Sequence, residues 1–169
     1  PYNELGAAAA AYNADEKELC RLDEIYSAVK APFEIRSGSE KVTRRFFKIC
    51  NNGQESFTWL YKSLTEQGIC KGHQCIAYGL YMRDNGIELS EGLAVYGYSI
   101  CSAIVTNCVK LVPLSQLAGQ KILGESFELI SSASEKALFT DINDIGISGA
   151  DFDLRAMQHE RLYSRQYMS

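Results

Sequence analysis

Few side chains in this 169-residue chain have the type and spacing that catalysis requires. Its two histidines are His73 and His159, so a histidine-based triad has only two possible bases. His159 lies between Gln158 and Glu160 near the C-terminus, where a base is difficult to hold in place. The sequence has no phosphate-binding loop ending in Lys-Ser or Lys-Thr, no nucleophile elbow and no His-Glu-x-x-His pair. We therefore expect a protein without catalytic residues of its own.

One cluster resembles a metal site, because Cys70, His73 and Cys75 lie close together at a turn. Thiolates and imidazoles are the ligands that zinc prefers, but zinc sites usually have a second close pair of ligands, which this sequence lacks. The spacing favours ordinary packing, with Cys75 on the inner face of the following helix and His73 capping that helix or facing solvent. A small cytosolic metal-binding or thiol redox protein that uses Cys70, His73 and Cys75 is the alternative interpretation.

Helices are the elements that must position these residues. Apolar spacings of three and four, read with Pro and Gly as breakers, predict helices over 3–30, 32–49, 57–68, 76–84, 90–110 and 115–130. The 90–110 helix carries a broad apolar stripe that includes Cys101 and Cys108, which we expect to pack in the core. Convincing alternation of period two is absent from the sequence. The predicted fold class is all-α, a bundle of about six or seven helices with an extended or weakly ordered C-terminal tail.

The chain divides into three parts by composition: a helical bundle over 1–139, a loop over 140–150 and a tail over 151–169. The tail can begin a helix, but its apolar stripe is narrow and its end mixes two Arg with two Tyr. It is either a frayed terminus or an arm that docks on a partner, because Tyr and Arg are enriched where interfaces concentrate their binding energy.

The overall composition excludes several classes of partner. The sequence has 17 Lys and Arg against 21 Asp and Glu, a net charge of -4 with both signs mixed along the chain, so we expect no nucleic-acid binding. The nearest approach to a membrane span, Leu93 to Val112, is interrupted by polar residues and a Lys, so we expect no membrane partner. The six cysteines are expected to be reduced thiols in the cytoplasm, because a core of this size needs no disulfides.

Four motifs together carry a resemblance to a known family. They are Glu-x-Arg at 34–36, His-x-x-x-x-Tyr-Gly at 73–79, Pro-Leu-x-Gln-x-x-Gly-Gln at 113–120 and His-x-x-x-x-Ser-Arg-x-Tyr-x-Ser at 159–169. In combination they resemble the UreF family of urease accessory proteins, from about residue 30 to the end. The matching residues before the tail are Glu34, Arg36, His73, Gly79, Pro113, Gln116, Gly119 and Gln120.

The sequence departs from this family in two places. Thr43 stands where the family usually has Gly, which puts close helix contact there in doubt. The N-terminal motifs Phe-Pro-x-Gly and His-Ser-x-Gly-x-Glu are absent from the sequence, so their residues cannot be carried over. We expect the N-terminal helices of the family to be missing, and the apolar stripe from Leu19 to Tyr26 to be more exposed than its pattern predicts.

The resemblance implies an all-α, cytoplasmic and generally dimeric protein that binds UreD (also called UreH). The pair then recruits the GTPase UreG, and the assembly inserts nickel into apo-urease. Such a protein is a chaperone and GTPase regulator without a cofactor of its own, because the assembly delivers nickel and the partner holds GTP. The tail residues implied in partner binding are Arg165, Tyr163, Ser164, Tyr167 and His159, and a guanidinium beside Tyr rings is well suited to an interface.

Overall fold

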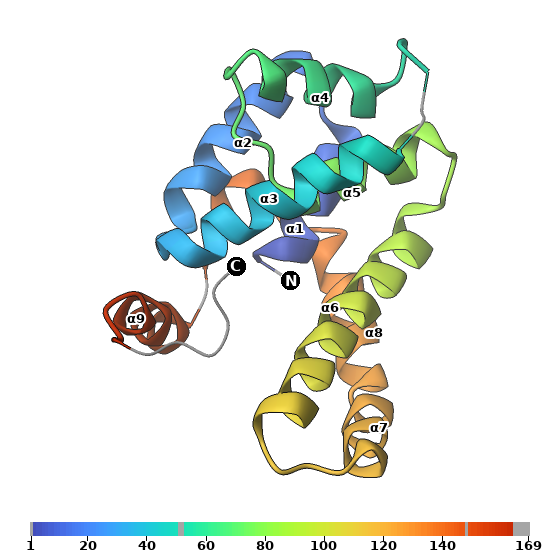
Figure 1. Ribbon diagram of the computed structural model, residues 1–169. Coiled ribbons are helices and arrows are strands. Elements are labelled where there is room, and N and C mark those ends of the chain that lie inside the picture. Colours follow the sequence, from blue (N-terminus) through green and yellow to red (C-terminus); the bar gives the residue numbers. More distant parts are fainter. Residues whose placement is uncertain (1, 51–52, 148, 164–169) are drawn as a thin grey trace.

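The chain is helical throughout the residues that the structure describes, which are 2–50, 53–147 and 149–163 of a computed structural model (Figure 1). This confirms the all-α class. The α-helices are α1 (Glu4–Asn13), α2 (Glu16–Val29), α3 (Phe33–Ile49), α4 (Phe57–Glu66), α5 (Gln74–Asp84), α6 (Leu89–Leu111), α7 (Gln116–Glu125), α8 (Phe127–Ala137) and α9 (Ala150–His159), with a 3-10 turn, η1, at Ile142–Asp144.

These nine α-helices of the described ranges exceed the six or seven that the sequence predicted, because two expected helices are each divided and a further helix, α9, forms where an extended or weakly ordered tail was expected. The 3–30 segment breaks before Asp15, whose side chain accepts from the backbone N–H of Glu18 in a capping box that starts α2. The 115–130 segment breaks at Ser126, which ends α7 and precedes α8. The loop expected over 140–150 contains η1, and α9 begins at its last residue.

The centre of the molecule is the crossing of α1 and α5. The alanines of α1 that face inward, among them Ala7, Ala8 and Ala11, are completely buried. Gly79 of α5 lies so close to α1 that a Cβ atom there would come within 2.2 Å of the Ala8 carbonyl oxygen. The small side chains of both helices therefore let their backbones touch, and this contact fixes the positions of the elements around them.

The expectation that the stripe from Leu19 to Tyr26 is exposed was wrong. Leu19, Leu22 and Tyr26 are all buried, and α2 is covered by α4 and by the segment that precedes α5. The ring of His73 packs edge-on against Tyr26 with 4.9 Å between ring centroids. The hydroxyl of Tyr61 on α4 donates to Asp23 on the same helix as Tyr26. This face of α2 is thus completed by residues of the chain itself.

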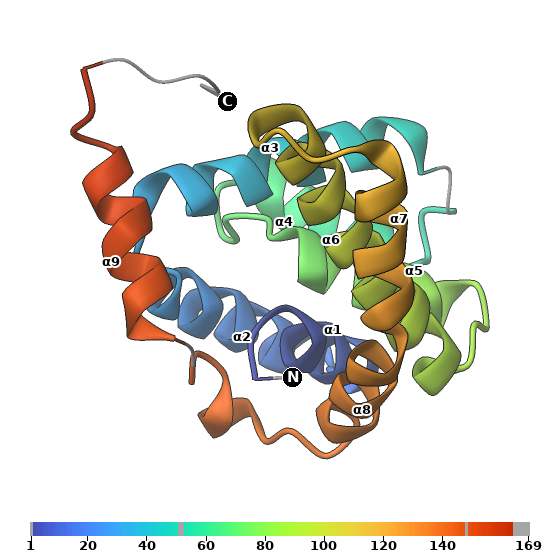
Figure 2. The ribbon, with the colours of Figure 1, turned by 90° about the horizontal axis from the view of Figure 1, so that it is seen from below.

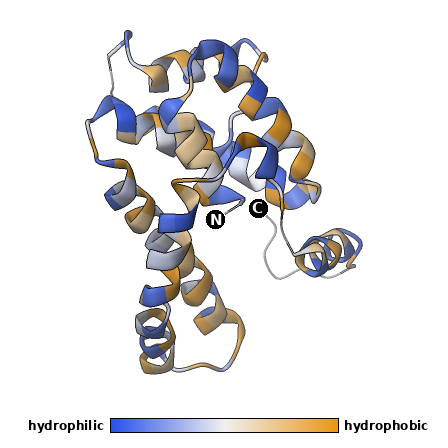
Figure 3. Ribbon diagram, turned by 180° about the vertical axis from the view of Figure 1, so that it is seen from behind, coloured by the Kyte–Doolittle hydropathy of each residue, from blue (hydrophilic) through white to orange (hydrophobic). Residues whose placement is uncertain are grey.

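Helices α6, α7 and α8 form an arm that extends away from the body formed by α1 to α5 (Figure 1). Only the first half of α6 is buried, at Gly92, Leu93, Tyr96 and Gly97. The expectation that Cys101 and Cys108 pack in the core was wrong, since both lie in the second half of α6 and are only partly buried. Seen from behind, the arm mixes hydrophobic and hydrophilic residues (Figure 3), and its exposed apolar side chains include Val95, Ile104 and Leu117. These side chains offer an apolar surface for contact with another molecule.

By length and composition alone, α6 is also long and apolar enough to cross a membrane, with 22% of its most apolar window buried. A single helix of this kind is weak evidence for a span, and α7 and α8 pack along one side of it.

Candidate functional site

The Glu-x-Arg motif lies at the corner between α2 and α3, and its two charged residues have different tasks. Arg36 turns back and donates from Nη1 to the carbonyl oxygens of Lys30 at 2.8 Å and Ala31 at 3.2 Å. These carbonyls follow the end of α2, so the guanidinium satisfies acceptors that the helix leaves unpaired. Arg36 therefore fixes the angle at which α3 leaves α2. Glu34, in the first turn of α3, points instead to the C-terminal helix.

Helix α9 is attached to the start of α3 by two polar contacts. The Nδ1 atom of His159 lies 2.7 Å from Oε2 of Glu34, and Oε1 of Glu160 accepts from the backbone N–H of Phe33 at 2.8 Å. Figure 2 shows α9 standing apart from the body beside the start of α3. None of the residues in α9 is buried. We call these two contacts the α9 latch, because they hold a helix that contributes little to the core.

The latch brings one predicted partner-binding residue, His159, together with one residue of the upstream motifs, Glu34. Tyr163 follows α9 with its side chain fully exposed. The remaining predicted tail residues, Ser164, Arg165 and Tyr167, lie outside the described residues.

His73 was expected either to cap α5 or to face solvent, and it is a buried residue that does not face solvent. It occupies the N-cap position of α5, but its ring makes no capping bond; its Nε2 instead lies 2.7 Å from Ser27 Oγ. Its backbone N–H donates to the Tyr61 hydroxyl at 2.8 Å, while its Nδ1 atom has no hydrogen-bond partner. Burial is the main cause that lowers the pKa of His73 to about 4. The ring is therefore neutral at pH 7.

Asp23 is the centre of the same buried network. Its carboxylate accepts from the Tyr61 hydroxyl at 2.6 Å and from the backbone N–H groups of Lys71 at 2.7 Å and Gly72 at 3.1 Å. Burial and the nearby Asp23 raise the pKa of Tyr61 well above its usual value, so the phenol stays protonated and donates. The segment that leads into α5 is thus held on α2 by one carboxylate.

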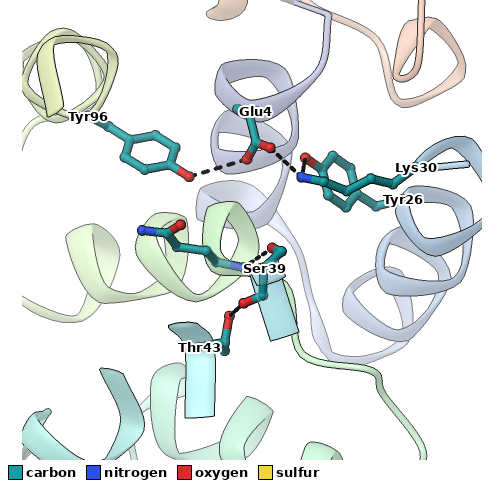
Figure 4. Close-up of polar contacts among 7 residues, drawn as sticks. Glu4, Tyr26, Lys30, Ser39, Thr43 and Tyr96 are labelled. Carbon is teal, nitrogen blue, oxygen red and sulfur yellow. Dashed lines mark hydrogen bonds and ion pairs between the residues drawn. The ribbon is translucent and has the colours of Figure 1, made fainter. Parts of the chain in front are cut away.

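A second buried polar cluster joins α1, α2 and α6, and sequence reasoning missed it (Figure 4). Lys30 Nζ forms an ion pair with Glu4 and donates to the Tyr26 hydroxyl at 3.0 Å, and the Tyr96 hydroxyl donates to Glu4 Oε2 at 3.3 Å. Burial raises the pKa of Glu4, but the Lys30 ammonium outweighs it, so the pKa of Glu4 is lowered and the carboxylate stays charged.

Glu4, Lys30 and Tyr96 also line a cavity of about 310 Å³ between α3 and α6. On the α3 side of this cavity, the Ser39 hydroxyl accepts from the backbone N–H of Gln74 at 3.1 Å, and Thr43 Oγ1 donates to the Ser39 carbonyl at 2.9 Å (Figure 4). Thr43 stands at the position where the family that the sequence resembles usually has Gly. Its side chain is completely buried, so the fold accommodates it. No spacing rule in the sequence connects Glu4 with Lys30 and Tyr96, which is why only the structure reveals the cluster.

The candidate metal ligands do not converge. Cys70 has its sulfur near Cys20, His73 contacts Ser27, and Cys75 is completely buried in the core. Burial raises the pKa of Cys75 well above its usual value, so it is a thiol at neutral pH. Within the described ranges, no group of three or more His, Cys, Asp or Glu side chains could hold a metal ion. The alternative of a metal centre at these three residues therefore has no geometric support.

The Pro-Leu-x-Gln-x-x-Gly-Gln motif forms the turn from α6 into α7 and the first turns of α7. Gln116, Gly119 and Gln120 line a groove of about 330 Å³ between the two helices, and Pro113 is exposed in the turn before it. A Cβ atom on Gly119 would come within 2.7 Å of Val109 Cγ2, so glycine here allows α7 to lie close against α6. The motif thus shapes the end of the arm.

Comparison with known proteins agrees with these motifs. The family model described as UreF matches residues 2–126, so the match begins well before residue 30, where the sequence resemblance was expected to begin. A urease accessory protein UreF from Actinobacillus pleuropneumoniae serotype 5b (strain L20) is 34% identical over 159 residues, which are 93% of this chain and 70% of the relative.

Two further relatives carry the same name. The protein from Haemophilus influenzae (strain ATCC 51907 / DSM 11121 / KW20 / Rd) is 36% identical over 153 residues, covering 89% of this chain and 65% of the relative. The protein from Paenarthrobacter aurescens (strain TC1) is 30% identical over 152 residues, covering 88% and 67%. The family model covers more than half of the chain and these relatives match most of it, so this chain belongs to the UreF family of urease accessory proteins.

Proposed function

We propose that this accessory protein acts as an adaptor in nickel insertion into apo-urease: it binds UreD (UreH), and the pair recruits and regulates the GTPase UreG. Nickel is then the cargo of the assembly, and GTP is held by UreG. The proposal assigns this chain to the cytoplasm, where these partners would meet. Membership of the UreF family supports this proposal. The exposed apolar side chains of α9 and the way α9 is attached to the body support it further.

Helix α9 has apolar side chains that remain exposed among the described residues, namely Phe152, Leu154 and Met157. It is held by the α9 latch rather than by a buried face. The His159–Glu34 contact is partly buried and the Glu160 contact is exposed. Contacts near the surface contribute about 1 kcal/mol each, so a partner that covers the apolar side chains can offset the loss of the α9 latch. We therefore assign UreD binding to Phe152, Leu154 and Met157 of α9 and to the residues that follow the helix, with Arg165 completing the surface that UreG recognises.

Arg165→Ala tests this assignment, and Arg155→Ala is the matched control. Arg155 is an exposed arginine on α9 whose Nη1 donates within the helix to Gln158 at 3.2 Å. Each variant is used to pull down UreD and UreG, and the amount of each partner recovered is measured. Because both variants lose one positive charge, a difference between them reports on the Arg165 guanidinium itself. We expect Arg165→Ala to lose UreG and Arg155→Ala to keep it. If Arg165→Ala still recruits UreG and activates urease fully, Arg165 is not part of the surface that UreG recognises.

We also propose that the protein forms a homodimer through the outer face of α6. Val95 and Tyr98 are exposed there, and they line a shallow groove of about 490 Å³ together with small side chains at 99, 102, 103 and 106. Small residues between larger apolar ones let two helices approach closely, as facing helices of a dimer must. The exposed ring of Tyr98 also stacks on Phe127 of α8, with ring centroids 5.9 Å apart, which extends the surface.

Val95→Glu tests the dimer, and Ile69→Glu serves as its control. The two side chains have nearly the same exposure, 60% and 59%, but Ile69 lies in the body between α4 and α5. Light scattering coupled to size exclusion should show that Val95→Glu shifts the protein toward monomer while Ile69→Glu does not. An unchanged dimer in Val95→Glu would place the interface elsewhere.

A further inference from the structure

Two cysteines that are far apart in the sequence face one another in the fold. The sulfur of Cys70, in the segment between α4 and α5, lies 4.0 Å from the sulfur of Cys20 on α2. The residues are separated by 50 positions, so no spacing motif marks them as a pair. Cys70 was a candidate ligand together with Cys75, but its neighbour in space is Cys20.

The backbone around the pair is fixed on both sides. Asp23 lies three residues after Cys20, on the same face of α2, and it accepts from the backbone N–H groups of Lys71 and Gly72 directly after Cys70. The N–H of Cys70 itself donates to the Leu64 carbonyl at 3.2 Å. Because both ends are held, the two sulfurs stay facing each other. A disulfide needs them about 2 Å closer.

The two thiols differ in access to solvent. Cys20 is partly exposed, whereas Cys70 is only 2% exposed. Burial, followed by the charge of Asp23 and the neighbouring Cys20, raises the pKa of the Cys70 thiol. An oxidant in solution therefore reaches Cys20 first, and Cys70 is the thiol that resolves the intermediate.

We propose that Cys20 and Cys70 form a reversible intramolecular disulfide, a redox modification site in the body of the protein. The oxidant is a small-molecule disulfide such as oxidised glutathione. The Cys20 thiolate attacks one of its sulfurs, forming a mixed disulfide and releasing one thiolate. Cys70 then loses its proton, its thiolate attacks the Cys20 sulfur, and the second glutathione leaves as a thiolate. Two protein thiols are oxidised, one disulfide is reduced, and the two protons end on the released thiols.

The bridge joins α2 to the segment that positions α5. It reinforces covalently the connection that Asp23 makes by hydrogen bonds, and it closes a loop that includes α3 and α4. Closing a loop of this length in the unfolded chain restricts it strongly, so the oxidised protein should melt about 10 °C above the reduced one. The modification would thus stabilise the body of the protein against unfolding.

The experiment equilibrates the full chain in glutathione buffers of increasing oxidised fraction, blocks free thiols with an alkylating reagent and digests with trypsin. Cleavage places Cys20 in the peptide 18–21 and Cys70 in the peptide 63–71. We expect these two peptides to appear joined, at a mass about 2 Da below their sum, and to separate on reduction. The melting temperature should rise in step with the joined fraction.

Cys20→Ser and Cys70→Ser should each abolish the joined peptide and the rise in melting temperature, while Cys101→Ser, at a partly buried cysteine on the arm, should keep both. Cys20 is partly exposed, so Cys20→Ser carries the test by itself even where a change at buried Cys70 hinders folding. The proposal is overturned when Cys20 carries glutathione at equilibrium with Cys70 still free, or when either residue is joined to a different cysteine.

Discussion

Replacing Asp23 by alanine measures how strongly the buried network holds the segment before α5. The carboxylate accepts from three buried or partly buried donors: the Tyr61 hydroxyl, the Lys71 N–H and the Gly72 N–H. Alanine leaves each donor without this acceptor, at a cost of about 1 to 3 kcal/mol per donor. Water entering the vacated space recovers part of it, so we expect Asp23→Ala to lower the free energy of unfolding by about 4 kcal/mol.

Urea denaturation provides the assay, followed by circular dichroism and by the fluorescence of Trp59, the single tryptophan of the chain. The midpoint should fall while the slope of the transition stays the same, because the surface exposed on unfolding is unchanged. The melting temperature should fall by about 10 °C. Asp23→Asn should lose about 2 kcal/mol, because its amide oxygen keeps one acceptor while its NH₂ group faces donors.

Glu24→Ala is the matched control, because Glu24 is the next residue on α2 and its side chain is exposed. It should change the stability by no more than about 0.5 kcal/mol. An Asp23→Ala variant within about 1 kcal/mol of the parent protein would refute the role given to this carboxylate.

Three further outcomes are expected. Burial lowers the pKa of His73 from 6.5 to about 4, so the unfolded chain binds a proton there more readily than the folded protein does. The free energy of unfolding should therefore be highest above pH 6.5 and fall by up to about 3 kcal/mol as the pH drops to about 4. His73→Phe should remove this dependence on pH, measured by urea denaturation. Gly79→Ala should cost about 3 kcal/mol, measured in the same way, because the added methyl meets the Ala8 carbonyl. His159→Ala should accelerate amide hydrogen exchange over 150–159 about threefold, since it removes the contact with Glu34, while exchange in α5 stays unchanged.

Local signals in the sequence predicted the class of the fold and most of its helices. Apolar spacings of three and four and the breakers Pro and Gly act over a few residues, and the structure has helices in all six predicted segments. The extra breaks also have local causes. The capping box of Asp15 and Glu18 could have been recognised from the sequence. The apolar spacing continues across it, so the sequence predicted one helix over 3–30 where the structure has two.

What the sequence could not predict is set by contacts between distant residues. An apolar stripe shows that a helix face will be covered but not by what, so burial was assigned wrongly to the second half of α6 and exposure wrongly to Leu19 and Tyr26. In the same way, the pairing of Glu4 with Lys30 and of Cys20 with Cys70 depends on how α1, α2 and the α5 segment cross. Such pairs have no fixed spacing along the chain.

The central claim is that this UreF protein connects UreD with UreG so that nickel reaches apo-urease. Its most direct test is to purify apo-urease with UreD, UreG and this protein, add nickel and GTP, and measure urease activity. We expect activation that needs GTP and this protein, is retained by Arg155→Ala and is lost with Arg165→Ala. Equal activation in the absence of this protein would contradict the account.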